Sequence, residues 1–89
     1  MNSNEDYGIV KFPLITEKSI RLNERENKII FIVDKKSNKN DIKNAVERIF
    51  NVRVVKINTT ILQNGRKKAF VRLANENPAR DIITQMGLM

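Results

Sequence analysis

The chain of 89 residues contains no cysteine, histidine or tryptophan, and its three glycines are scattered at positions 8, 65 and 87. Without thiols and imidazoles it cannot form disulfides, thiolate metal sites or the Ser-His and Cys-His pairs of nucleophilic enzymes. Scattered glycines exclude a glycine-rich phosphate loop. A site built from carboxylates alone stays open as an alternative, but most acidic residues lie beside basic ones on predicted helix surfaces, where weak exposed pairs are usual. We therefore expect no catalytic residues, no metal site and no cofactor.

Long hydrophobic runs are also missing. The longest, Ile29–Val33, is far shorter than the roughly 20 apolar residues that cross a bilayer. Residues 1–8 are polar and partly acidic, unlike an export signal, and the absence of cysteine fits a reducing cytosol. Domains commonly contain about 100–150 residues, so this length predicts one domain. We expect residues 1–10 to be a flexible tail, residues 11–89 to form the domain, and the protein to be cytoplasmic and away from membranes.

Positive charge, by contrast, is abundant. Seventeen lysines and arginines against ten acidic residues give a net charge of +7. Between Lys35 and Arg72 there are eleven basic and two acidic residues, whereas the rest of the chain has six basic and eight acidic ones. A field of one sign in half of a small domain favours a polyanionic partner, with a merely solvated basic face as the alternative.

The first third of the chain predicts an extended segment, a short helix and a strand. Residues 12–15 are extended because a proline at position 13 disfavours helix at the residue before it. Thr16 can cap a helix that ends near Leu22. From Asn27 onward the apolar residues alternate between two faces, as in an interior strand: Ile29, Phe31 and Val33 on one, Ile30 and Ile32 on the other.

The central helix has the clearest pattern in the sequence. It follows a polar connection over residues 35–38, and Asn38 or Ser37 can cap it, with Asp41 completing a capping box. Asn51 ends it. Its apolar stripe at helical spacing consists of Ile42, Ala45, Val46, Ile49 and Phe50.

A hairpin and a last helix follow. The apolar phase of a strand over residues 52–62 slips at Val54–Val55, which predicts either a β-bulge or a strand that is buried on both faces at one end. Asn64-Gly65 favours a type I′ turn before a return strand over residues 67–73. The last helix is predicted from Asn77 as its cap, Pro78 in its first turn, a stripe of Ala79, Ile82, Ile83 and Met86, and Gly87 as its stop.

This order of elements predicts an α+β fold. We expect a small two-layer sandwich, in which a three- to four-stranded, mainly antiparallel sheet has helices on one face. The crossover through the central helix should be right-handed. The other face of the sheet is then free for a partner.

Basic residues form two groups, one running from the loop into the central helix and one around the hairpin. Ammonium and guanidinium groups suit phosphate oxygens. Asn58 and Thr59 can reach sugar hydroxyls and base edges, although an ordinary polar strand face is the alternative for them. With Lys18 added, the predicted RNA-binding residues are Lys18, Lys35, Lys36, Lys39, Lys43, Arg53, Lys56, Asn58, Thr59, Arg66, Lys67 and Lys68.

Aromatic residues are too few to favour stacking on single strands. Phe31 and Phe50 fall on apolar stripes and belong to the core. Residues 66–73 faintly resemble the RNP1 strand of an RNA-recognition motif, but Lys67 replaces its glycine and only Phe70 can stack on a base. Recognition of folded RNA through phosphates and shape fits better. An RNA-recognition-motif-like RNA binder, or a nucleic-acid-associated adaptor, is the alternative.

Short motifs in a fixed order along residues 10–74 carry a family resemblance. They include Phe12-Pro13-Leu14-Ile15-Thr16-Glu17-Lys18, Phe31-Ile32-Val33-Asp34, Phe50-Asn51-Val52, Ile57-Asn58-Thr59 and Lys67-Lys68-Ala69-Phe70-Val71. Together they resemble the universal ribosomal protein twenty-three family of the large subunit. The end of the chain, from Asp81 to Leu88, looks like the archaeal and eukaryotic branch of that family.

The resemblance implies a ribosome-bound structural protein that binds large-subunit ribosomal RNA near the peptide exit tunnel, among neighbouring ribosomal proteins. It also implies docking of the signal recognition particle and nascent-chain chaperones at the position of Glu17. A helix-dipole role is the alternative for this carboxylate. Bacterial members carry a long basic loop between the hairpin strands, whereas only residues 63–66 separate the strands here, which puts a role inside the tunnel in doubt.

Overall fold

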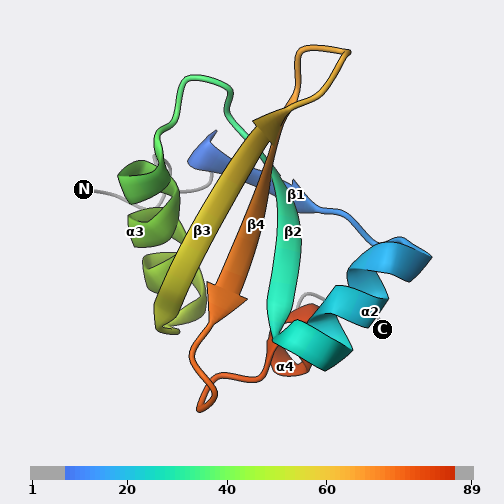
Figure 1. Ribbon diagram of the computed structural model, residues 1–89. Coiled ribbons are helices and arrows are strands. Elements are labelled where there is room, and N and C mark those ends of the chain that lie inside the picture. Colours follow the sequence, from blue (N-terminus) through green and yellow to red (C-terminus); the bar gives the residue numbers. More distant parts are fainter. Residues whose placement is uncertain (1–7, 86–89) are drawn as a thin grey trace.

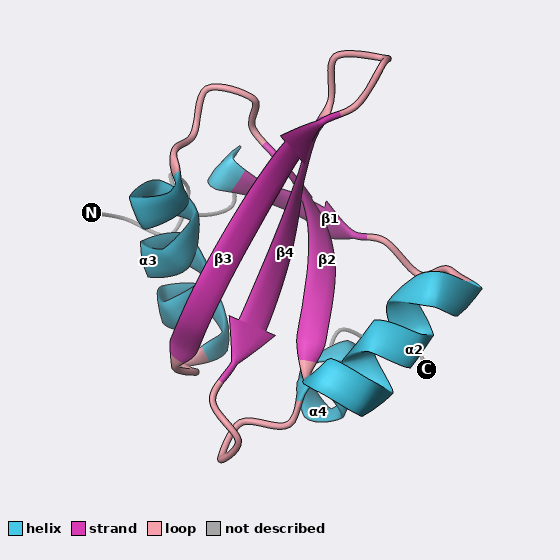
Figure 2. Cartoon of the chain, in the orientation of Figure 1, coloured by secondary structure: helices cyan, strands magenta, loops and turns pink. Residues whose placement is uncertain are grey.

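The computed structural model describes residues 8–85 of the chain. Within this range the elements are β1 (Val10–Pro13), α2 (Glu17–Glu26), β2 (Lys28–Val33), α3 (Lys39–Phe50), β3 (Val54–Ile61), β4 (Lys67–Leu73) and α4 (Ala79–Gln85) (Figure 1 and Figure 2). The strands form one antiparallel sheet in the order β1-β2-β4-β3. This confirms the predicted α+β class, with four strands in the sheet. No helix in this part of the chain is long and apolar enough to cross a membrane.

The helices lie on different sides of the sheet. As predicted, two of them, α3 and α4, cover one face, which is turned away from the viewer in Figure 1, while α2 lies on the other side at the end where β2 begins. The chain runs up β2, behind the sheet through α3, and up β3 to the left (Figure 1), so the crossover has the predicted right-handed sense. Over β3 and β4, no described helix covers the near face. That face is available to a partner.

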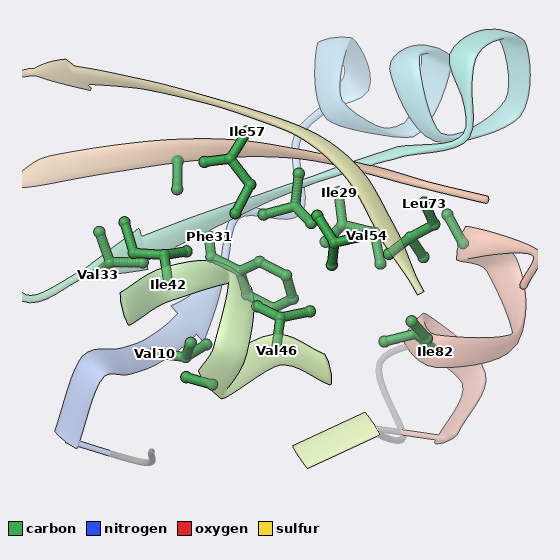
Figure 3. Packing of buried hydrophobic residues seen from close by; sticks show 14 residues of the cluster. Val10, Ile29, Phe31, Val33, Ile42, Val46, Val54, Ile57, Leu73 and Ile82 are labelled. Carbon is green, nitrogen blue, oxygen red and sulfur yellow. The ribbon is translucent and has the colours of Figure 1, made fainter. Parts of the chain in front are cut away.

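The core lies between the sheet and α3, and strand alternation decides which side chains enter it. In the register of β2 and β4, Phe31 is opposite Ala69 and Ile29 is opposite Val71, and all four are buried. Residues of β3, α3 and α4 complete the cluster, among them Val54, Ile57, Ile42, Val46 and Ile82 (Figure 3). Phe31 and Phe50, both predicted to belong to the core, stack on each other with ring centroids 5.8 Å apart.

Local capping explains where the first two helices begin. Thr16 caps α2 in a capping box with Ser19, and Asn38 caps α3 in a box with Asp41, as predicted for both caps. Helix α2 extends beyond its predicted end at Leu22 because Asn27 provides a left-handed C-cap with φ 55°. Asn27 is therefore the end of a helix, and β2 starts one residue later.

The hairpin confirms the predicted bulge and corrects the predicted turn. The register of β3 against β4 shifts between Val54 and Lys56, so Val55 has no partner residue in β4. Of the residues in the turn, only Gly65 has a positive φ, 85°, so the type I′ assignment is wrong. The Gly65 N–H donates to the carbonyl of Leu62 at 3.0 Å, and the Leu62 N–H donates to Arg66 at 2.7 Å. This pattern is that of a three-residue loop whose last residue is left-handed.

Asn27 joins α2 to one stretch that lies far away in the sequence, from the end of β4 to the start of α4. Its Nδ2 donates to the carbonyl oxygens of Leu73, Ala74 and Asn77 at 3.1, 3.1 and 3.2 Å. Its Oδ1 accepts from the N–H of Ala79 at 2.7 Å, so Asn27 supplies an acceptor to the first turn of α4.

The predicted cap of α4, Asn77, has a different role. Its Oδ1 accepts from the N–H of Arg53 at 2.9 Å and so links the start of α4 to the entrance of β3. The prediction from local sequence was wrong because the fold brings Asn27 to the position where a local cap was expected. Met86, the last residue of the predicted stripe, and Gly87, the predicted stop of the helix, lie outside the described residues.

The predicted tail, residues 1–10, lies mostly outside the described residues. Of its last residues, Val10 belongs to β1 and is buried, and Ile9 packs against the core. The carbonyl of Ile9 accepts from the N–H of Asp34 at 2.8 Å. Backbone pairing with the end of β2 therefore includes residues ahead of position 11.

The contacts of Asn27 predict a large effect of its side chain on stability. Asn27→Gly keeps the left-handed conformation but leaves the N–H of Ala79 and three carbonyl oxygens without this partner. We expect it to lower the free energy of unfolding by about 2–3 kcal/mol. Asn51→Gly is the matched control, because Asn51 is the left-handed C-cap of α3 with φ 54°, and it should change stability by less than about 0.5 kcal/mol. Urea denaturation measures both, and equal losses would contradict this role for Asn27.

Candidate nucleic-acid interface

Three rows of side chains run across the side of the sheet opposite α3. They are exposed or half-buried on β3 and β4, whereas Ile30 and Ile32 of β2 are buried. The register places Lys56 opposite Arg72 and Arg72 opposite Lys28, so the first row holds three cations from three strands. The second row is Asn58, Phe70 and Ile30, and the third is Thr60, Lys68 and Ile32, with Phe12 of β1 beyond Ile32. We call these three rows, together with Phe12, the open face. Its members alternate with the buried core residues of the same strands.

The row of three cations is unfavourable without a partner. Like charges directly opposite each other on neighbouring strands destabilise a sheet. Lys28 has an acidic neighbour, since its Nζ lies 3.2 Å from Oε1 of Glu26, whereas Lys56 and Arg72 are exposed to solvent. Bound anions relieve such repulsion, and a nucleic-acid backbone supplies several at regular spacing.

Two phenylalanines add flat apolar surface to this charge. Lys68 Nζ lies 5.1 Å from the ring centroid of Phe70, and the guanidinium carbon of Arg66 lies 5.6 Å from that of Phe12. Both distances are within the roughly 6 Å of a cation–π contact. Phe12 is 41% exposed, which is unusual for a phenylalanine in a sheet. The open face thus combines cations with aromatic rings.

The predicted hairpin residues divide between the two sides of the sheet. Lys56, Asn58 and Lys68 belong to the open face, and Arg66 reaches it through Phe12. Thr59 lies opposite Ala69, and therefore faces the helices.

Lys67 also turns away from the open face. It is half-buried, and its Nζ donates to the carbonyl oxygen of Ser37 in the loop before α3. This hydrogen bond ties the hairpin to the β2–α3 connection. Lys67 and Lys68, neighbours in the sequence, thus have different surroundings.

The basic residues of α3 extend the first row around the edge of the sheet. Lys39 and Lys43 line a groove between α3 and β3 together with Lys56. On the other side of the bulge, Arg53 and Arg72 line a shallow depression. Five cations therefore lie around the β3 edge and the adjoining end of the open face.

Three predicted residues lie elsewhere. Lys35 and Lys36 are exposed in the turn after β2, and Lys35 lines a hollow together with Arg66. Lys18 is exposed in the first turn of α2, which lies beyond β2 from the β3 edge (Figure 1). The structure does not bring Lys18 to the rows of the open face.

Sequence reasoning left seven members of the open face out of the predicted site, among them the charged or aromatic residues Phe12, Lys28, Phe70 and Arg72. The sequence alone could have indicated two of these residues, because Phe70 and Arg72 alternate with apolar residues along the same strand as Lys68 and so share its face. The position of Lys28 beside Arg72 follows only from the register of β2 and β4. Residues distant in sequence could not be placed in one row without it.

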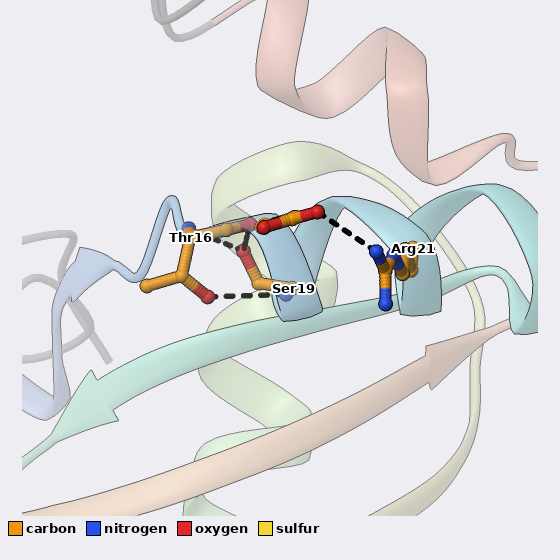
Figure 4. A network of polar contacts seen from close by, with 4 residues as sticks. Thr16, Ser19 and Arg21 are labelled. Atoms are coloured by element: carbon orange, nitrogen blue, oxygen red, sulfur yellow. Dashed lines mark hydrogen bonds and ion pairs between the residues drawn. The ribbon is translucent and has the colours of Figure 1, made fainter.

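Glu17 lies at the exposed start of α2. Next to it, Thr16 and Ser19 exchange hydrogen bonds, from Thr16 N–H to Ser19 Oγ at 2.8 Å and from Ser19 N–H to Thr16 Oγ1 at 3.1 Å (Figure 4). Glu17 Oε1 pairs with Arg21 Nη2 at 2.7 Å, and these side chains are 83% and 64% exposed. An exposed pair of this kind stabilises a helix by only about 0.3–0.5 kcal/mol, so the carboxylate remains accessible to a partner.

Comparison with known proteins identifies the family of the chain. The family model of ribosomal protein L23 matches residues 8–83. The large ribosomal subunit protein uL23 of Methanococcus aeolicus is 42% identical over 82 residues, which cover 92% of this chain and 95% of that protein. The chain belongs to the ribosomal protein L23 family, and it is of the archaeal type. The family resemblance found in the sequence is thereby confirmed.

The different surroundings of neighbouring lysines predict different effects on stability. Lys67→Met removes the hydrogen bond to Ser37 but keeps the length of the side chain, and we expect it to lower the free energy of unfolding by about 1–2 kcal/mol. Lys56→Met, on the exposed face, should change stability by less than about 0.5 kcal/mol. Urea denaturation of both variants tests this, and a loss confined to Lys56→Met would contradict the structural role of Lys67.

Proposed function

We propose that the chain is a structural constituent of the large ribosomal subunit and binds large-subunit ribosomal RNA through the open face. The observation that carries this proposal is the row of Lys56, Arg72 and Lys28, whose mutual repulsion a bound polyanion relieves. Membership of the ribosomal protein L23 family supports RNA of the large subunit as that polyanion.

Phosphate contacts account for affinity in this proposal. Lys39 and Lys43 continue the first row around the β3 edge, so a strand of RNA can follow the cations from the sheet onto α3. Asn58 and Thr60 lie between the charged positions and can bond to sugar hydroxyls. The role is binding and assembly rather than catalysis, and it places the protein on ribosomes in the cytoplasm beside other ribosomal proteins.

Salt dependence of RNA binding tests this interface. Lys56→Ala and Arg72→Ala should each weaken binding to deproteinised large-subunit RNA and lower the slope of log affinity against log salt by about 0.7–0.9. The slope falls because a variant that makes one phosphate contact fewer releases fewer counterions when it binds. Arg80→Ala on α4, an exposed arginine away from the open face, is the control and should leave the slope unchanged. Equal slopes for all three variants would remove the first row from the RNA interface.

A docking role near the exit tunnel is a second proposal, and it concerns Glu17. The supporting observation is an exposed carboxylate on α2, a helix that lies apart from the cations of the β3 edge (Figure 1). RNA is an unsuitable partner for a carboxylate, whereas basic surfaces of proteins are suitable. We propose that the signal recognition particle and nascent-chain chaperones contact α2 here while the open face holds RNA.

Charge removal at Glu17 separates docking from a dipole role. Ribosomes that carry Glu17→Gln should bind purified signal recognition particle with a lower association rate, and the difference should shrink at high salt because a rim charge acts mainly on encounter. The variant should melt nearly as the wild type does. Glu24→Gln, another exposed acid of α2, is the matched control and should bind at the normal rate. A lower melting temperature with unchanged binding would assign Glu17 to the helix dipole alone.

A further inference from the structure

A hollow of about 270 Å³ lies at the corner where the hairpin loop comes close to β1 and the end of β2. Its apolar wall is made by Phe12 and Ile32, and three cations, Lys11, Lys35 and Arg66, line it as well. The volume is slightly below the range of roughly 300–1,000 Å³ that is usual for small-molecule sites. There is room in it for one flat group and little more.

The groups around the hollow suit a nucleobase better than a phosphate. Phe12 offers a half-exposed ring with the Arg66 guanidinium 5.6 Å from its centroid, and both are surfaces on which bases stack. Asp34 also lines the hollow, and its Oδ1 accepts from the N–H of Lys36 at 3.2 Å. A carboxylate repels a phosphate, but it accepts hydrogen bonds from the exocyclic amino groups of bases.

The cations at the hollow are then available to the phosphates on either side of such a base. Lys11 and Lys35 are exposed, as required for contact with a backbone that stays outside. Paired bases of an A-form helix are stacked and cannot enter a hollow of this size, whereas bases of loops and bulges can turn outward. The shape and charge therefore fit an irregular part of a folded RNA.

We infer that the hollow lined by Phe12, Ile32 and Arg66 receives one unpaired base of the RNA that the open face binds. This inference rests on the proposed function, because the base belongs to the same RNA. It makes Phe12 a recognition residue for RNA structure, in addition to the phosphate contacts of the first row.

Substitution of Phe12 tests the inference with deproteinised large-subunit RNA as the probe. Phe12→Leu keeps an apolar side chain but removes the ring, and it should weaken binding about tenfold without changing the salt slope, since stacking releases no counterions. Phe12→Tyr keeps the ring and should bind as the wild type does. Irradiation at short wavelength followed by peptide mapping should link a nucleotide to the peptide of residues 12–18 in the wild type, and to a much smaller extent in Phe12→Leu.

The control is Ile61→Ala, an apolar side chain that is 61% exposed and lies outside the open face. It should leave affinity, slope and cross-linking unchanged. Normal affinity of Phe12→Leu, with Lys56→Ala still weakened, would overturn the base site while the proposed RNA interface stands. Normal affinity of every open-face variant, or no binding by the wild type, would overturn both. Loss of affinity together with a lower salt slope in Phe12→Leu would also overturn the base site, because it would indicate lost phosphate contacts.

Discussion

The register of β4 between β2 and β3 is the constraint on which both the core and the site depend. The strand pairs with both neighbours along nearly its whole length. Its side-chain period of two sends Ala69, Val71 and Leu73 into the core and Lys68, Phe70 and Arg72 to the open face. A slip by one residue would exchange the two sets and bury two charges. The same backbone hydrogen bonds therefore hold the core together and line up the cations of three strands.

The bulge at Val55 makes this register compatible with the sequence of β3. Val54 and Ile57 are three residues apart, so in a regular strand they would face opposite sides. The extra residue brings both of them into the core and leaves Val55 53% exposed. It also sets Lys56 opposite Arg72, since pairing resumes there. One irregularity thus completes the core and the first row, and because β3 is an edge strand it also hinders pairing with another chain.

What the sequence predicts well here is local, and what it misses depends on distant partners. The caps at Thr16 and Asn38 use side chains within three residues, and they were predicted correctly. The bonds of Asn27 span 46 to 52 residues, so a pattern search assigned its cap to Asn77. Likewise Lys56 and Lys68 come from obvious basic clusters, whereas Lys28 joins them only through strand pairing. In the hairpin, Asn64-Gly65 correctly marks the position of the turn. The type of turn depends on the loop length, which is set by the pairing of Leu62 with Arg66 at the strand ends.

The open face is also where this small domain departs from the rules that favour stability. Three like charges share a row, and Phe12 is exposed to water, although both are unfavourable in an isolated protein. Natural proteins accept such departures mainly at functional sites. The opposite face, with the buried contacts of α3 and α4, supplies the stability that makes them tolerable. An RNA that neutralises the row removes the repulsion at the moment of binding, and it stabilises only the folded chain, in which the row exists. In the proposed interface, folding and RNA binding are therefore coupled through the same three side chains.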